Sequence, residues 1–332
     1  MKIAVIGAGA IGSVVAAYLS KAGEDVALIG KPQQVQAIRS SGLRIKGVRG
    51  EEVFHLNSLV RLDREYDLVI FTVKTQDLET AYTDNCEFLD NAIILTTQNG
   101  VQADNILSGH LEKEKIVSSI VMFGATYTNP GEVTFNFEGD WVIGKPFSMN
   151  DHVVSDIYEI VRKAFAVVIA PDIMGMKWLK LFVNFNNCLP ALTGKPMQET
   201  YADMHLCRLS VLLLKEGVEA VHNVGVGLVS LPHFPVERIL GLVTMPVDQA
   251  AGIINKTMTT LSKEPLYGSI LQSILRKKVS EIDYINGEIV LLAKHSGLKV
   301  PLNRKVVEMV HEVENSGKFF SVEEIKKEFN LI

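Results

Sequence analysis

Apolar and polar positions follow a regular order over the first half of the chain. Short runs that are apolar almost throughout alternate with segments in which apolar residues recur at helical spacing. The runs are Lys2–Ile6, Val26–Ile29, Asp67–Val73, Ala92–Thr97 and Ile116–Val121. Nearly continuous apolarity is typical of parallel strands buried on both faces. The order therefore predicts a Rossmann-like, doubly wound α/β sheet. Farther along, Val133–Phe137 and Trp141–Ile143 flank a Glu-Gly-Asp turn and are predicted to form a hairpin.

The second half of the chain has a different pattern. From Ile173 onward the strand signals stop, and apolar residues recur every three or four positions. The longest helices predicted from this spacing are 174–189, 205–222 and 269–295. We therefore predict an α/β domain over residues 1–171 and an all-α domain over residues 172–332, with the boundary near Pro171.

A glycine-rich loop follows the first apolar run directly and leads into a predicted helix. It consists of Gly7, Ala8, Gly9, Ala10, Ile11 and Gly12. In a dinucleotide-binding loop of this spacing, the first glycine allows the turn, the second lets the backbone approach a pyrophosphate, and the third lets helix and strand pack closely. The loop therefore predicts a dinucleotide site; the alternative is a glycine-rich turn in another α/β fold.

The end of the second predicted strand bears on the choice of cofactor. NAD-preferring folds of this type place an acidic residue there to bind the adenosine ribose. Here the strand Val26–Ile29 is followed by Gly30 and Lys31, so a cation stands where the carboxylate is expected. Lys31 is suited to a 2′-phosphate and favours NADP over NAD, whereas the plainer interpretation is a solvated lysine on a loop.

Two further polar residues follow the ends of buried strands. Lys74 comes after the third run, and Asn99 comes shortly after the fourth. Ligands of open α/β sheets bind beyond the carboxyl ends of the strands, so both residues are candidates for the cofactor site. For Asn99 the alternative is a simple Asn-Gly turn with Gly100.

The predicted helix 174–189 carries polar residues on one side of an otherwise apolar segment. At about 100° per residue, its apolar side comprises Trp178, Leu181, Phe182, Phe185 and Leu189. The opposite arc comprises Lys177, Lys180, Asn184, Asn187 and Cys188. Lys180 and Asn184 are four residues apart and project together, as a catalytic cation and a substrate-orienting amide would. The alternative is a polar stripe that faces solvent.

Composition narrows the class of protein. The 332 residues carry a formal net charge of −5, which gives no reason to expect a nucleic-acid partner. Cys86, Cys188 and Cys207 are far apart and odd in number, so we expect a reducing compartment, no disulfide framework and no metal site. A low-pKa thiol at Cys188, beside the predicted lysine, is a weaker alternative to a small buried side chain. With no targeting or membrane-spanning segment in evidence, we predict a cytoplasmic enzyme.

Five motifs together resemble the ketopantoate reductase (2-dehydropantoate 2-reductase) family over nearly the whole chain. They are the loop Gly7–Gly12, Thr72–Lys74, Gln98–Gly100, Lys177–Asn184 and Glu281–Gly287. The resemblance implies an NADP-dependent oxidoreductase acting on CH–OH groups. Its reaction would be the NADPH-dependent reduction of ketopantoate, a 2-keto acid, to pantoate in pantothenate biosynthesis.

The resemblance also implies a role for each candidate residue. Lys180 matches the catalytic lysine that donates the proton, and Glu281 matches a glutamate that contacts the cofactor and positions that lysine. The cofactor residues implied are the glycine loop, Lys31 in place of the family's usual arginine, Lys74, Asn99 and Glu281. The substrate residues implied are Asn99, Asn184 and Ser269.

Two departures from the family pattern lie on the substrate side. Cys188 stands where the family commonly has asparagine, and Ser273 stands where it usually has aspartate. They leave open a reductase of a different 2-keto acid on the same scaffold. A β-hydroxyacid dehydrogenase and a protein that senses NADPH without turnover are also open, although the Glu281–Gly287 motif argues against the dehydrogenase. A small-molecule keto acid is the expected partner, and a homodimer is possible.

Overall fold

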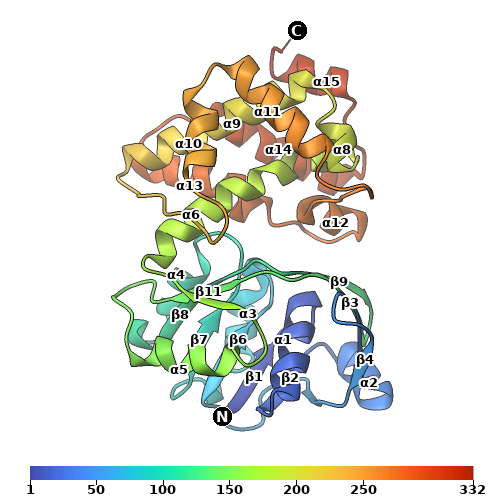
Figure 1. The fold of residues 1–332 in the computed structure, drawn as a ribbon, viewed down its shortest axis with the longest axis vertical. Helices are drawn as coiled ribbons and strands as arrows, with labels where there is room; N and C mark the ends of the chain where they lie inside the picture. The colour runs from blue at the N-terminus through green and yellow to red at the C-terminus, as the bar shows by residue number, and fades with distance from the viewer. Residues whose placement is uncertain (332) are drawn as a thin grey trace. The chain divides into compact units, whose positions relative to one another are not determined.

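The computed structural model describes residues 1–331, and the chain divides into two compact units. The first comprises Met1–Met174 and the second begins at Gly175. Figure 1 shows both units as ribbons and labels many of their helices and strands.

The first unit is built on an eight-stranded sheet in the order β12-β11-β8-β7-β6-β1-β2-β5. Its strands are β1 (Lys2–Ile6), β2 (Asp25–Ile29), β5 (Asn57–Leu59), β6 (Leu68–Phe71), β7 (Ile93–Thr96), β8 (Ile116–Val121), β11 (Trp141–Gly144) and β12 (Val167–Ile169). The strands from β8 to β5 in this order are parallel to their neighbours, and β11 pairs antiparallel with β8. Loops therefore leave β1, β2, β6 and β7 at one edge, where a ligand is expected.

Helices cover both faces of this sheet. Within β1, Ile3 and Val5 pack on the face covered by α1 (Ala10–Lys21) and α5 (His152–Val161). Ala4 and Ile6 pack on the face covered by α3 (Leu78–Thr83) and α4 (Ala103–Ser108). The remaining helical segments are α2 (Pro32–Ser41), η1 (Thr75–Asp77), η2 (Cys86–Phe88) and η3 (Lys113–Lys115). The predicted doubly wound α/β fold is confirmed.

A second, four-stranded sheet in the order β4-β3-β10-β9 packs against α1. Its strands are β3 (Leu43–Gly47), β4 (Glu52–Phe54), β9 (Gly124–Asn129) and β10 (Glu132–Phe137). The predicted hairpin of residues 133–137 and 141–143 is wrong, because β10 pairs with β9 and β3 while β11 joins the large sheet. All four residues of β11 are buried, so this strand belongs in a sheet that is covered on both faces.

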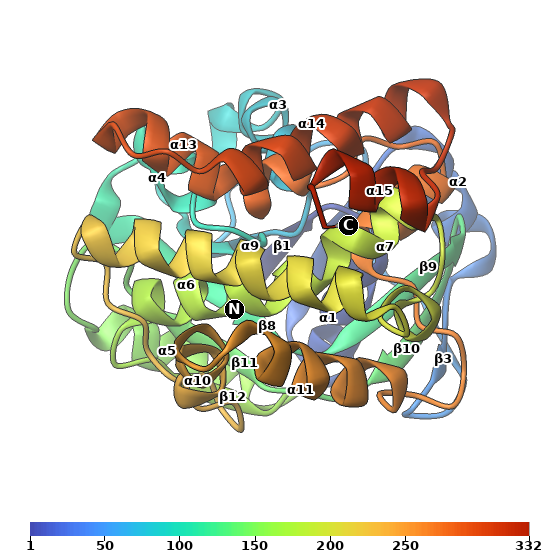
Figure 2. The same ribbon diagram turned by 90° about the horizontal axis from the view of Figure 1, so that it is seen from above.

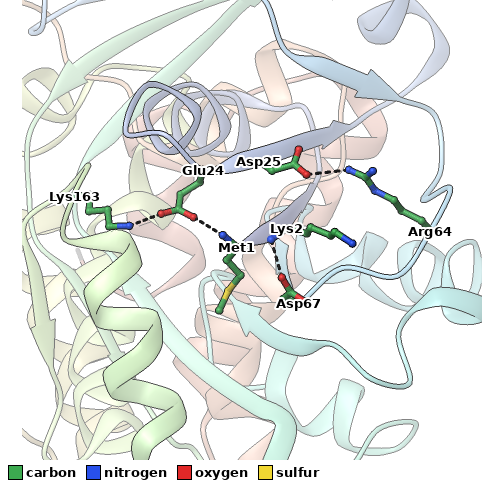
Figure 3. Close-up of polar contacts among 7 residues, drawn as sticks. All are labelled: Met1, Lys2, Glu24, Asp25, Arg64, Asp67 and Lys163. Carbon is green, nitrogen blue, oxygen red and sulfur yellow. Dashed lines mark hydrogen bonds and ion pairs between the residues drawn. The ribbon is translucent and has the colours of Figure 1, made fainter.

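The amino ends of the central strands are fixed by charged contacts (Figure 3). The Glu24 carboxylate accepts from the Met1 ammonium at 2.9 Å and from Lys163 Nζ at 2.6 Å, and its side chain is only 5% exposed. The Lys2 backbone N–H donates to the Asp67 carboxylate at 2.8 Å. This edge lies opposite the glycine loop, and its contacts hold the sheet together away from the candidate site.

Replacing Glu24 by glutamine should lower the free energy of unfolding by about 1–2 kcal/mol, because the acceptor of two charge-assisted contacts loses its negative charge. Burial alone would raise the Glu24 pKa, but bonds from Lys163 and the terminal ammonium outweigh it and lower the pKa from 4.5. The contribution of the Glu24 carboxylate to the free energy of unfolding is therefore complete above pH 4.5, and it is lost as the pH falls through the lowered pKa of Glu24.

Denaturant unfolding of the wild type and Glu24→Gln at neutral and acidic pH measures this difference. Asp25→Asn is the matched control, since Asp25 pairs with Arg64 at 3.2 Å and both side chains are largely exposed. That variant should change stability by less than about 0.5 kcal/mol. An equal loss in both variants would contradict the special role of Glu24.

The second unit is helical, as predicted. Its segments are α6 (Ile173–Asn184), which begins just before the boundary, η4 (Phe185–Asn187), α7 (Cys188–Thr193), α8 (Met197–Thr200), α9 (Met204–Asn223), α10 (Glu237–Thr244), α11 (Val247–Thr259), α12 (Ser269–Leu275), η5 (Ile282–Tyr284), α13 (Asn286–Ser296), α14 (Pro301–Ser316) and α15 (Val322–Glu328). The long helix α9 lies between α13 and α14 on one side and α10 and α11 on the other (Figure 2). No helix within residues 1–331 is long and apolar enough to cross a membrane.

Two of the predicted long helices are interrupted. The segment 174–189 becomes α6, a 3₁₀ turn and α7. The segment 269–295 becomes α12, η5 and α13, and Lys277 after α12 has a φ of 55°, which an α-helix does not accommodate. The second interruption brings residues 280–284 out of the helical register and gives Glu281 a separate turn.

Candidate functional site

The glycine loop connects β1 to α1 with the geometry that its sequence predicts. Gly7 has a φ of 125°, which favours glycine. A Cβ on Gly12 would lie 2.0 Å from the Gly7 carbonyl oxygen and 2.3 Å from Thr72 Oγ1. The turn at Gly7 and the close packing at Gly12 are thereby confirmed.

Gly9 differs from its two neighbours. A Cβ on Gly9 would meet no atom within 4 Å, so the fold itself does not require glycine there. Gly9 is the N-cap of α1, whose first turn contains no acidic residue and leaves N–H groups free of helical partners. Open space beside a positively polarised helix end fits a pyrophosphate, and the cofactor roles of Gly7, Ala8, Gly9, Ala10, Ile11 and Gly12 stay predictions.

Lys31 lies beside this loop. It is exposed, and it directly precedes α2, after the end of β2. The Gly7 N–H donates to the Ile29 carbonyl at 2.9 Å, and Gln34 Nε2 donates to the Ala8 carbonyl at 2.6 Å. These bonds hold the Lys31 segment against the glycine loop, where a 2′-phosphate of a dinucleotide would require a cation.

Lys74 and Asn99 are held at the carboxyl ends of β6 and β7 by a residue whose role the sequence does not reveal. The buried amide of Gln98 donates 2.9 Å bonds to the carbonyls of Phe71 and Val73. Thr75 Oγ1 also donates to the Asn99 carbonyl at 3.3 Å. Both candidate side chains are partly buried, and Gln98 fixes the spacing of the two segments that carry them.

A second buried cluster supports the same edge. The Asp104 carboxylate accepts from Thr96 Oγ1 at 2.6 Å and from Ser118 Oγ at 2.7 Å, and it is 1% exposed. It ties the end of β7 to β8 and to the start of α4. The role of Asp104 cannot be predicted from the sequence, because an isolated aspartate after Gly100 has the same local pattern as an ordinary surface aspartate.

On α6 the structure decides between a buried and a solvent-facing polar side. The apolar side is buried as predicted. On the opposite arc Lys177, Asn187 and Cys188 are buried as well, and Lys180 and Asn184 are partly buried. The alternative of a solvent-facing stripe is therefore wrong. Burial lowers the pKa of the Lys180 ammonium from its ordinary value of 10.5, and no neighbouring charge contributes to the shift.

Two contacts join the segments that carry the remaining predicted residues of the second unit to Asn187 and Cys188, which follow α6. A Cβ on Gly268 would lie 2.2 Å from Asn187 Oδ1, so the start of α12, with exposed Ser269, lies against η4. The side chain of Asn286, which belongs to the same motif as Glu281, acts on the Cys188 thiol and lowers its pKa against the larger opposing effect of burial. Glu281 itself is 9% exposed at the start of η5.

Cys188 and Ser273, the two departures from the family pattern, are uncharged side chains. Burial raises the pKa of the Cys188 thiol to about 12, so the alternative of a reactive thiol is wrong and a small buried side chain is confirmed. Ser273 Oγ donates to the Ser269 carbonyl at 3.0 Å, within α12. Neither side chain carries a charge. Within residues 1–331 no cluster of three or more His, Cys, Asp or Glu side chains is arranged to hold a metal ion.

Comparison with known proteins gives consistent similarities. Residues 3–146 match the family model "Ketopantoate reductase PanE/ApbA", and residues 172–314 match the model of its C-terminal part. The 2-dehydropantoate 2-reductase of Pyrococcus horikoshii is 28% identical over 324 residues, which cover 96% of this chain and 99% of the relative. That of Archaeoglobus fulgidus is 25% identical over 95% of this chain and 98% of the relative.

Solved structures agree. A PanE/ApbA family ketopantoate reductase from Ralstonia eutropha superposes with a TM-score of 0.80 at 28% identity, covering 95% of this chain and 99% of that one. A D-mandelate dehydrogenase bound to NADH and anilino(oxo)acetate superposes with a TM-score of 0.83 at 22% identity, covering 95% and 99%. The latter likeness concerns the fold.

Proposed function

The chain belongs to the ketopantoate reductase family of NADP-dependent oxidoreductases that act on CH–OH groups, and from this premise we propose that it reduces ketopantoate to pantoate with NADPH. The observation that supports this proposal most is the pair Lys180 and Asn184. Both side chains lie one turn apart on the same face of α6 and are partly buried, although the rest of the helix is largely apolar. Burial also lowers the pKa of the Lys180 ammonium.

The bound dinucleotide supplies the hydride for the keto carbon. As the carbonyl oxygen gains electron density, the Lys180 ammonium stabilises it and donates its proton, which yields the hydroxyl group. The lowered pKa brings the ammonium closer to the acidity required for transfer near neutral pH. Asn184 orients the reacting oxygen, and Glu281, from its turn before α13, contacts the cofactor and positions Lys180.

The remaining substrate contacts come from two further segments. Ser269 binds the substrate from the start of α12, and Asn99 binds both the nicotinamide half of the cofactor and the substrate. Lys74 acts beside Asn99 on the cofactor. The amide of Gln98 supports these assignments, because it holds the Lys74 and Asn99 segments at a fixed spacing. Residues 1–171 then form the NADP-binding domain and residues 172–332 the substrate domain.

Replacing Lys31 by alanine should raise the KM for NADPH roughly fivefold, as expected for the loss of an exposed ion pair worth about 1 kcal/mol. The KM for NADH should stay nearly constant, because NADH lacks the 2′-phosphate. Steady-state kinetics with both cofactors measure the difference. Lys46→Ala, on the exposed side of β3, is the control lysine and should leave both values unchanged. Equal losses with NADPH and NADH would contradict the 2′-phosphate assignment.

The substrate is tested by following NADPH oxidation with a panel of 2-keto acids that includes ketopantoate, pyruvate, 2-ketoisovalerate and phenylglyoxylate. The proposal requires the highest kcat/KM for ketopantoate. Preference for another acid would support a different reductase on this scaffold, which the neutral side chains of Cys188 and Ser273 favour as the second candidate. NADPH binding without turnover of any acid would support a sensor. Gel filtration tests whether the chain forms a homodimer.

A further inference from the structure

The turn that carries Glu281 is held from α14 by a histidine that contacts two carboxylates. His311 Nε2 lies 2.9 Å from Asp283 Oδ1, two residues after Glu281. His311 Nδ1 lies 2.9 Å from Glu314 Oε2, one turn farther along α14. The imidazole therefore links the turn to α14. Helix α13, which follows the turn, also packs against α14 (Figure 2).

The same glutamate also holds the opposite end of the turn. Glu314 Oε1 accepts a 2.7 Å bond from the Ser280 backbone N–H, and Ser280 is buried. Contacts from α14 thus reach the residue before Glu281 and the residue two positions after it. The Glu314 side chain is 10% exposed, so this part of the connection is largely shielded from water.

We propose that His311, with Glu314 and Asp283, is a positioning residue that holds the Glu281 turn in its active geometry when the imidazole is protonated. The proposal rests on the proposed function, in which Glu281 contacts the cofactor and positions Lys180. His311 touches neither, and it acts only through the turn.

Protonation matters because the imidazole has two nitrogens and each faces a carboxylate. The cation donates from both, whereas neutral imidazole donates from one and turns a lone pair toward the second carboxylate. Burial alone would lower the His311 pKa, but Asp283 and Glu314 outweigh burial and raise the pKa above 6.5. Among the described residues packed against α14, these two carboxylates are the charged groups that act on the ring.

The sign of the pH dependence follows from the raised pKa. The stabilisation is complete below pH 6.5, the unfolded value, and is lost as the pH rises through the folded pKa. Activity that depends on the Glu281 turn should therefore fall over the same range. Lys180 gives a separate alkaline loss, which a substitution at His311 leaves in place.

The test compares wild type, His311→Gln and His311→Lys by kcat and NADPH KM from pH 6 to 9, with His295→Gln as control. His295 is exposed on α13 and outside the connection. We expect His311→Gln to lower kcat/KM about five- to tenfold at pH 6 and to flatten the wild-type dependence. His311→Lys keeps a cation throughout and should retain, above the folded-state pKa of His311, the part of the activity that the wild type loses as its imidazole deprotonates.

A second measurement separates this proposal from the proposed function. The apparent Tm of the wild type should exceed that of His311→Gln by about 3 °C at pH 6, with the difference vanishing at high pH. That readout needs no substrate, so it holds even if ketopantoate is not reduced. If His311→Gln matches the wild type in Tm and in its kinetic pH profile, the proposal is overturned. If Tm changes but kcat and KM do not, His311 is only structural and the positioning role is overturned.

Discussion

Lys180→Ala should lower kcat by about 10²–10⁴-fold while the dissociation constant for NADPH changes little. The substitution removes the proposed proton donor and leaves the residues proposed to bind the cofactor, which include the glycine loop and Lys31. Lys180 is partly buried on α6 and its pKa is lowered by burial, so the ammonium is poorly solvated before the reaction. A group in that state gains most when negative charge develops beside it.

With the purified protein, stopped-flow kinetics measure kcat and fluorescence titration measures the NADPH dissociation constant. Lys180→Arg keeps the positive charge, but arginine does not release its proton near neutral pH, so only part of the rate should return. Lys256→Ala, an exposed lysine on α11, is the matched control and should retain wild-type kcat. Equal losses of rate and of NADPH affinity in Lys180→Ala would contradict the proton-donor role.

The pH profile gives a further check on the same residue. With a pKa lowered from 10.5, the wild-type lysine loses its proton at a lower pH than an exposed lysine. The wild-type kcat should therefore fall at a pH below 10.5, and the residual rate of Lys180→Arg should not show this loss. A wild-type profile that stays flat to pH 10.5 would contradict the lysine as the acid.

The class of fold can be predicted here because burial on both faces leaves a local signature. The parallel strands β1, β6 and β7 are apolar almost throughout, and the runs between them have helical spacing. Strand partners do not follow from such runs. β10 and β11 are adjacent in sequence, but their partners come from β9, β3, β8 and β12, and only the buried faces decide between sheets.

Some residues of the candidate site can likewise be predicted from the sequence, and others cannot. Lys180 and Asn184 can be found from helical spacing, because four residues place both side chains on one face. Gln98 and His311 cannot, because Phe71 and Val73, which Gln98 binds, and Asp283, which His311 contacts, lie 25 to 28 residues away in sequence. The break after α12 is equally hidden, since Lys277 with its positive φ gives no compositional signal that distinguishes it from Lys278. Local periodicity identifies the groups proposed to react, whereas tertiary hydrogen bonds determine what positions them.

Gly12→Ala should lower the stability of the fold, whereas Gly9→Ala should lower the affinity for NADPH, although both add one methyl group to the same loop. In Gly12→Ala the methyl would lie 2.0 Å from the Gly7 carbonyl oxygen, a backbone atom that cannot move without shifting the turn. We expect a loss of about 3 kcal/mol in the free energy of unfolding, the upper range for an overpacked site. Denaturant unfolding of the apoprotein measures it.

In Gly9→Ala the methyl meets no protein atom within 4 Å, and the residue has a φ of −84°, which alanine adopts readily. Stability should therefore stay within about 1 kcal/mol of wild type or rise slightly, because alanine restricts the unfolded chain. The methyl would instead occupy the space through which a pyrophosphate approaches α1, and NADPH affinity should fall about tenfold or more. Fluorescence titration with NADPH measures that loss. Unchanged affinity in a folded Gly9→Ala variant would mean that the phosphates do not bind at this helix end.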